Sequence, residues 1–198
     1  MRLVEIYSDY IWSACYEGEK VDAFNRLFRQ WLDAEFLHNF YASHKRFLDG
    51  NIFFSGYTEK DVELNTFKEA LNLRKDFKKF FKNAQKGIHP DFDDRFLVLN
   101  RNAQEDDLKR EMYGHPKDDR QMTSVLRLYA IKLPSAQNKP PAYIITGGGI
   151  KLVDNNYQMK ELKREMPLID TVQNWLNRNK IETKEQLIDY LNRLNNNK

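Results

Sequence analysis

Apolar positions follow two different spacings in the first quarter of the chain. Two short strand-like runs flank Ser8-Asp9 in RLVEIYSDYIWSACYEGE, a pattern that predicts an N-terminal β-hairpin. From Asp22, which can cap a helix, large apolar residues recur every three or four positions, with a possible restart at Asp33. This spacing predicts helices with aromatic core faces, formed by Phe24, Leu27, Phe28, Trp31, Leu32, Phe36, Leu37, Phe40, Tyr41, Phe47 and Leu48.

A third helical stretch follows a loop at 50–56. The sequence TEKD at 58–61 resembles a capping box, and helical spacing of apolar residues continues to Ala84. Gly87 and Pro90 then end the pattern. We therefore expect one further long helix before the second half of the chain begins.

The second half begins with a strand-like run, DRFLVLN at 94–100, and a polar stretch at 101–121. The polar stretch has no sustained apolar period, so we expect an exposed connection there. SVLRLYAIKL and AYIITGGGIKLV, separated by the loop PSAQNKPP, predict an antiparallel strand pair at 125–133 and 142–153. The remaining residues are predicted to be helical, with Pro167 in a first turn and TKEQ at 183–186 as a second capping box.

Length and composition favour a single domain. The chain has 198 residues, of which 41% are hydrophobic, enough for one core. We expect one α+β domain over 1–198: a hairpin and helical part at 1–90, then a sheet core and C-terminal helices at 91–198. The sheet is expected to be small and mostly antiparallel, packed by long aromatic-rich helices.

Cysteine content and charge narrow the possible classes. The single cysteine, Cys15, cannot form an internal disulfide or a cysteine-based zinc cluster. The longest apolar runs are far below the ~20 residues of a membrane span, and the start lacks a signal-peptide pattern, so we expect a cytoplasmic protein without membrane contact. Net charge is +3. Residues 101–198 hold 17 basic and 13 acidic residues against 15 and 16 in 1–100, so the positive excess lies in the second half.

Several common chemistries are excluded by motif. The run Gly147, Gly148 and Gly149 lacks both the Gly-Lys-Ser/Thr ending of a phosphate-binding loop and the spaced glycines of a dinucleotide fold, so no nucleotide cofactor is expected. No metal site is expected either, because His38 and His44 are six residues apart and no HExxH pattern exists. The glycines indicate a bulge, a sharp bend, or a close approach by another backbone or a ligand.

The strand that precedes the glycines carries candidate chemistry. Side chains alternate along LRLYAIKL, so Arg127 and Tyr129 are predicted on the same face, with Lys151 arriving from the neighbouring strand. A cation and a phenol of this kind could hold a phosphodiester, or they could be ordinary residues on an exposed sheet face. His115 could act as a general acid or base because histidine titrates near pH ~6.5, or it could be a solvent-exposed histidine.

These two strands resemble those of the RelE/HigB-type ribonuclease toxins. In that family an R-x-L-Y strand is followed by an apolar-His-Gly-Phe-x-Lys-Lys strand and a helix. Arg127, Leu128 and Tyr129 match the first element, and Gly147 with Lys151 approximates the second. Leu152 replaces the second lysine, and Gly148 and Gly149 replace the bulky part of the motif. The layout is also similar to that of a group of uncharacterised bacterial proteins.

The resemblance implies a bacterial toxin of a toxin-antitoxin pair with a RelE-like core. Such a toxin is a metal-independent endoribonuclease that cleaves mRNA on the ribosome by 2′-hydroxyl attack and is neutralised by an antitoxin. Arg127 would stabilise the scissile phosphate, Tyr129 would stack on or position a base, with stacking worth ~1–3 kcal/mol, and Lys151 would add positive charge. His115, the candidate general acid or base named above, would complete the catalytic set. RNA-binding residues would be Lys132, Arg120 and Lys117.

A second hypothesis needs no catalysis. The chain could be a protein-interaction module, or a phage-related or defence-related modulator, that keeps a RelE-like sheet. The nuclease hypothesis requires Arg127, Tyr129 and Lys151 to converge in a basic concavity, whereas the interaction hypothesis predicts an exposed apolar patch elsewhere.

Overall fold

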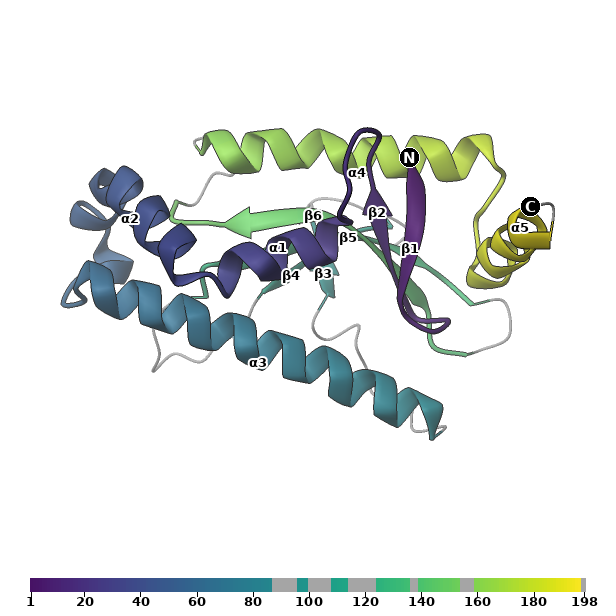
Figure 1. Ribbon diagram of the computed structural model, residues 1–198, viewed down its shortest axis with the longest axis horizontal. Coiled ribbons are helices and arrows are strands. Elements are labelled where there is room, and N and C mark those ends of the chain that lie inside the picture. Colours follow the sequence, from purple (N-terminus) through teal and green to yellow (C-terminus); the bar gives the residue numbers. More distant parts are fainter. Residues whose placement is uncertain (87–95, 100–107, 114–123, 136–138, 154–158, 197–198) are drawn as a thin grey trace.

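The computed structural model describes residues 1–86, 96–99, 108–113, 124–135, 139–153 and 159–196. These residues form a mixed α+β structure with a six-stranded, mostly antiparallel sheet and five α-helices (Figure 1). The predicted α+β class is therefore confirmed.

The sheet has the strand order β1-β2-β6-β5-β4-β3. Its strands are β1 (Arg2–Tyr7), β2 (Ile11–Cys15), β3 (Phe96–Val98), β4 (Lys109–Tyr113), β5 (Leu126–Leu133) and β6 (Ala142–Ile150). The hairpin β1-β2 and the antiparallel pair β5-β6 are confirmed. Among the described strands, β2 and β6 form the parallel pair, and the helices between them in sequence make the connection that a parallel pair needs.

The first three helices begin where the capping residues predicted. Asp22 caps α1 (Ala23–Trp31), and Asp33 caps α2 (Ala34–Asp49) by accepting a hydrogen bond from the Phe36 amide. A short 3-10 helix, η1 (Ile52–Phe54), lies in the predicted loop. Thr58 and Asp61 then form the predicted capping box at the start of α3 (Glu59–Gln85).

The C-terminal helices confirm one local prediction and correct another. Thr183 and Gln186 bond reciprocally at the start of α5 (Lys184–Asn196), as a capping box does. The placement of Pro167 in a first turn was wrong, because α4 (Lys160–Arg178) begins seven residues earlier and contains it. A proline inside a helix removes one backbone donor but does not end the helix here.

One strand was missed. Residues 101–121 were expected to be an exposed connection, but β4 lies within them and pairs with both β3 and β5. Its sequence KREMY begins with three charged residues and has no apolar alternation, although Arg110 and Glu111 are only 7% and 8% exposed in the sheet. Their burial depends on neighbouring strands, which local periodicity cannot detect.

The sheet lies between two helical layers. α4 packs on β5 and β6, while α1 packs on β2 and β6 and α3 contacts β5 from the other side (Figure 1). Large aromatic side chains fill the interior, as predicted: Trp31, Tyr41 and Phe77 are fully buried. This layering determines which sheet residues solvent can reach.

Candidate functional site

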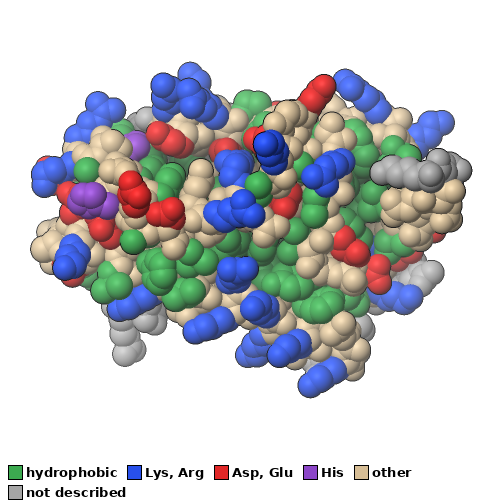
Figure 2. Space-filling view, viewed as in Figure 1, with side chains coloured by type: hydrophobic (Ala, Val, Ile, Leu, Met, Phe, Trp, Pro, Cys, Tyr) green, Lys and Arg blue, Asp and Glu red, His purple; other side chains and the backbone are tan. Residues whose placement is uncertain are grey.

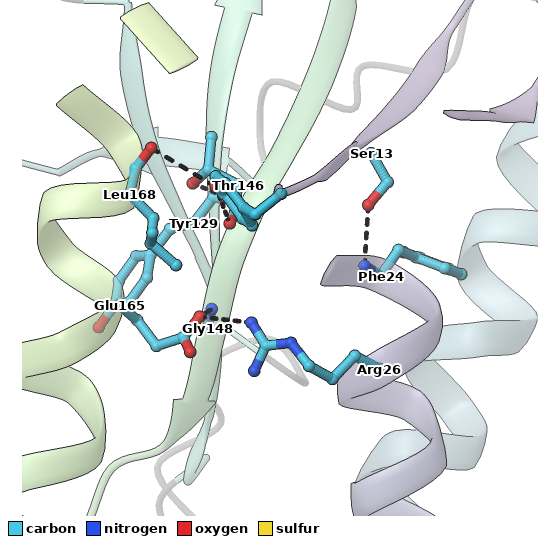
Figure 3. A network of polar contacts seen from close by, with 9 residues as sticks. Ser13, Phe24, Arg26, Tyr129, Thr146, Gly148, Glu165 and Leu168 are labelled. Atoms are coloured by element: carbon cyan, nitrogen blue, oxygen red, sulfur yellow. Dashed lines mark hydrogen bonds and ion pairs between the residues drawn. The ribbon is translucent and has the colours of Figure 1, made fainter. Parts of the chain in front are cut away.

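The strand pair β5-β6 places the two main candidates side by side. Arg127 lies opposite Gly149, and Tyr129 lies opposite Gly147. Opposed residues of an antiparallel pair project to the same face. Because Gly147 and Gly149 lie against α4, Arg127 and Tyr129 project to the face on which α4 packs. The Tyr129 side chain extends toward α4 in Figure 3.

Helix α4 covers this face. Tyr129 is 0% exposed and Arg127 is 5% exposed. The glycines opposite them leave room for α4, because a Cβ at Gly147 would clash with Glu165 and one at Gly149 would press on Leu162. In this arrangement a base cannot stack on Tyr129, and RNA can reach the two side chains only after α4 separates from the sheet.

Arg127 is also engaged locally. Its Nη1 atom donates hydrogen bonds to the backbone oxygens of Ser124 (2.7 Å) and Leu126 (2.9 Å). Its Nε atom lies 3.5 Å from Oε1 of Glu111 on β4. These contacts hold the guanidinium against the start of β5 and place an opposite charge beside it.

Glu69 fixes the same end of β5 from the other face. This α3 carboxylate is 2% exposed, and it accepts hydrogen bonds from the Ser124 hydroxyl and from the amides of Val125 and Leu126, both at 3.3 Å. Sequence reasoning missed Glu69. The signal was an acidic residue on the buried stripe of α3, between Thr66 and Leu73.

The other predicted residues divide into two groups. Lys151 directly follows β6, and its amide donates to the Val125 oxygen (2.7 Å), so its backbone lies beside the start of β5, near Arg127. Lys132 is half-buried in β5, opposite Tyr143. His115, Lys117 and Arg120 lie outside the described residues.

The glycine run belongs to a strand irregularity. The pairing of β5 with β6 shifts between Tyr129 and Ala130, which leaves Thr146 as an extra residue, as in a β-bulge. A Cβ at Gly148 would clash with the Arg127 backbone oxygen. Gly147 and Gly149 meet α4, so the run accommodates close approach by both a neighbouring strand and a helix.

The bulge lies where β6 loses its neighbour on one side. β2 pairs with β6 at residues 143–145, and within the described part of the chain no strand pairs with the next backbone groups of β6 on that side. Side chains satisfy them. The Tyr16 hydroxyl donates to the Thr146 oxygen (2.6 Å). Glu165 accepts from the Gly148 amide (3.1 Å) and from Arg26 (2.9 Å) (Figure 3). This junction joins α1, β6 and α4.

Electrostatics at the junction follow from burial. Burial raises the pKa of the Tyr16 phenol well above its usual value, and the Glu165 charge adds to the effect, whereas Arg26 opposes it. Burial alone would lower the pKa of Arg26, but its hydrogen bond to Glu165 and the attraction of that carboxylate raise it overall. The junction therefore keeps a neutral phenol beside a charged pair.

A second candidate surface lies on the outer side of α3. We define the α3 basic face as Lys68, Arg74, Lys75, Lys78, Lys79, Lys82 and Lys86, all of which are exposed. The buried residues of α3 occupy the opposite side of the helix. Figure 2 shows Lys and Arg side chains gathered along the lower edge of the molecule, where α3 lies.

The charge on this surface exceeds that of the whole chain. Residues 68–86 contain seven basic and two acidic residues, whereas the chain carries +3 in total. Of the two acids, Glu69 is buried and Asp76 is half-buried. Sequence reasoning located the positive excess only to the second half of the chain. The missed signal is the helical spacing of Lys75, Lys79, Lys82 and Lys86.

An apolar surface lies at the other end of α3. Around the α2-α3 connection, Ile52 is 83% exposed, Phe53 51% and Tyr57 46%, and Leu64 is 52% exposed on the adjoining turn of α3. A pocket of about 540 Å³ lies between the end of α2 and the start of α3, lined by Lys45, Leu48, Asp49, Gly50, Asn51, Ile52, Phe54, Ser55, Gly56, Tyr57 and Glu59. We call the exposed residues Ile52, Phe53, Tyr57 and Leu64 the hairpin patch, after the helical hairpin that α2 and α3 form, which is distinct from the β1-β2 hairpin.

Comparison with known proteins adds no assignment: no protein family, curated protein or solved structure matches the chain. Within the described residues, no helix combines the length and apolar character needed to cross a membrane.

Proposed function

We propose that the chain is an RNA-binding protein of the RelE/HigB toxin type, and that it holds RNA phosphates on the α3 basic face. The observation that carries this proposal is the row of exposed lysines and arginines along one side of α3. From Lys68 to Lys86 the helix rises about 27 Å, a length over which a strand with a phosphate every ~3.4 Å carries about eight phosphates.

The composition of the α3 basic face favours nucleic acid over a lipid surface. An amphipathic helix that enters a membrane presents apolar residues beside its charges. The apolar side of α3 is already buried in the core, and from Arg74 to Lys86 its outer side has no large exposed hydrophobic residue. Phosphate contacts without an apolar wedge are typical of backbone recognition.

Salt-dependent RNA binding tests the proposal. We expect the purified chain to bind a fluorescently labelled single-stranded RNA, with affinity falling linearly on a log-log plot against salt concentration. The triple substitution Lys75→Ala, Lys79→Ala and Lys82→Ala should weaken binding and reduce the slope by about 2, since each lost phosphate contact removes ~0.7.

A matched control separates local contacts from net charge. Arg29→Ala, Lys160→Ala and Arg178→Ala remove the same charge from exposed positions on α1 and α4, and should leave the slope close to that of the wild type. Equal losses in the two triple variants would contradict the α3 site. Binding to anionic vesicles but not to RNA would contradict the RNA assignment.

Endoribonuclease activity is a second candidate, favoured by the shared face of Arg127 and Tyr129. For cleavage, α4 would have to leave that face, releasing the Glu165 contacts and the ion pair between Lys109 and Asp170 (2.7 Å). Arg127 would then stabilise the charge that develops on the phosphate during 2′-hydroxyl attack. Lys151, whose backbone lies at the same end of the strand pair, would add a second positive charge near this phosphate.

Induced expression with primer extension tests cleavage. Growth arrest and discrete mRNA cuts should occur with the wild type and disappear with Arg127→Ala, with Arg127→Lys as the charge-retaining variant. Glu165→Gln with Asp170→Asn should increase cutting, because it loosens α4. Arrest that persists in a folded Arg127→Ala variant would remove Arg127 from the reaction, and circular dichroism checks folding.

The non-enzymatic alternative rests on the hairpin patch. An antitoxin-like partner could cover Ile52 and Phe53, whose exposure is high for large apolar side chains. Affinity capture from a bacterial lysate followed by mass spectrometry would supply candidate partners, and calorimetry with each purified candidate would measure its binding. Ile52→Ser with Phe53→Ser should abolish binding, whereas Leu194→Ser, at a 46% exposed position on α5, should not. Unchanged binding by the double variant would place the contact elsewhere.

A further inference from the structure

We propose that His38, Glu59 and Glu63 form a binding site for a divalent transition metal of the Zn²⁺ class, joining α2 to α3. One ligand atom from each residue can be chosen so that all three lie within 4.8 Å of one another. His38 Nδ1 already lies 3.2 Å from Glu63 Oε1. The proposal does not depend on RNA binding.

The carboxylates are positioned by the start of α3. Glu59 and Glu63 are four residues apart, so they lie on one side of the helix, one turn apart. The capping box of Thr58 and Asp61 fixes this first turn, with the Asp61 amide donating to the Thr58 hydroxyl (3.2 Å) and the Thr58 amide to the Asp61 carboxylate (2.8 Å). The spacing of the two carboxylates is therefore set by helix geometry.

The histidine is positioned by a buried contact one turn further along both helices. Tyr41 and Thr66 follow His38 and Glu63 by three residues each, and their hydroxyl oxygens are 2.6 Å apart in the interior. This bond, between side chains that are both 0% exposed, fixes the register of α2 against α3. Because this register places His38 beside the first turns of α3, its side chain faces the two glutamates.

The donor set indicates the class of metal. One imidazole nitrogen with two carboxylate oxygens suits Zn²⁺ and similar ions, whereas Mg²⁺ and Ca²⁺ prefer oxygen ligands alone. Bonds of about 2.0–2.2 Å require the three side chains to close slightly around the ion. The His38 side chain is 68% exposed, so an ion can enter and water can take a fourth position. Sequence spacing could not find this set because its members come from two helices.

Titration with ZnCl₂ alone tests the site. Calorimetry of the full chain, pretreated with chelator, should show one equivalent of Zn²⁺ bound, and binding should raise the unfolding temperature. His38→Ala, Glu59→Gln and Glu63→Gln should each weaken this binding by at least about tenfold. All three side chains lie at the surface or are only half-buried, so these variants should fold, and circular dichroism checks this.

Two controls make the result specific. His44 lies on the same helix, and its Nε2 is 3.4 Å from Glu161. Among the described residues it belongs to no group of three possible metal ligands, so His44→Ala should bind Zn²⁺ like the wild type. Glu35→Gln removes an exposed α2 carboxylate and should also have no effect. The proposal would be overturned if the chain did not bind Zn²⁺ or if the three ligand variants bound it like the wild type. It would also be overturned if Mg²⁺ at the same concentration displaced the bound Zn²⁺.

Discussion

Glu165 accepts a hydrogen bond from the Gly148 amide, 3.1 Å away, at the point where β6 has lost β2 as its neighbour. The same carboxylate oxygen accepts from Arg26 at 2.9 Å. A side chain of α4 thus completes a strand edge and ties it to α1. An unpaired backbone amide at a buried edge would cost free energy, so this contact stabilises the junction of three elements.

The first prediction concerns Gly147, because a Cβ there would clash with the Glu165 carboxylate. Gly147→Ala should displace Glu165 and lower the free energy of unfolding by about 1–3 kcal/mol, measured by urea denaturation. Gly50→Ala is the matched control, since a Cβ at Gly50 meets nothing within 4 Å and its φ is −105°. It should change stability by less than about 0.5 kcal/mol. Equal effects would show that close approach by α4 does not constrain Gly147.

The second prediction concerns the pair between Arg26 and Glu165, whose side chains are 25% and 13% exposed. Glu165→Gln removes the charge but keeps an oxygen for the Gly148 amide, and Arg26→Met keeps the apolar stem. A double-mutant cycle should give a coupling energy of about 1 kcal/mol. The more exposed pair Lys45 and Asp49, whose side chains are both 63% exposed, should give less than about 0.5 kcal/mol. A coupling energy near zero in the first cycle would show that the ion pair between Arg26 and Glu165 does not contribute to stability.

The third prediction concerns Glu69, which accepts from the Ser124 hydroxyl and two strand amides in the interior. Glu69→Ala removes the acceptor that these groups share and should cost about 3 kcal/mol or more. Hydrogen exchange should quicken most at Val125 and Leu126. Asn72→Ala, at an exposed position on the same helix, should leave both stability and exchange unchanged. Uniform exchange across the sheet in Glu69→Ala would contradict this local role.

The fold was predictable where its signals are local. Asp22 and Asp33 marked the starts of α1 and α2, and Thr58 marked the start of α3, because a capping residue acts on amides two or three positions away. β4 was not predictable in this way. Its Arg110 and Glu111 are buried by neighbouring strands from distant parts of the sequence, so its polar sequence predicted a connection.

The candidate site shows the same division. Alternation along β5 predicted that Arg127 and Tyr129 share a face, and the structure has them there. Their burial under α4 depends on the contact of Leu162 and Glu165 with the glycines of β6, which no local pattern reveals. Side-chain spacing on a strand therefore predicts which residues are neighbours, whereas access to them depends on the packing of a helix from elsewhere in the chain.

The last prediction concerns alkaline pH, because burial raises the pKa of Tyr16 and of Tyr41 above the ordinary 10.0. The unfolded chain releases these phenol protons first, so their contribution to stability is complete below pH 10.0 and is lost as the pH rises above it. One pH unit higher, each tyrosine should account for a loss of about 1.4 kcal/mol.

Urea denaturation at several pH values measures this loss in the wild type and the variants. Tyr16→Phe and Tyr41→Phe should each flatten the fall of stability with pH, even though both lose hydrogen bonds and start from lower stability. Phe53, 51% exposed, provides the control, and Phe53→Leu, which removes an exposed ring without a phenol, should retain the wild-type slope. If all three variants kept that slope, the alkaline loss would come from groups other than the two buried phenols.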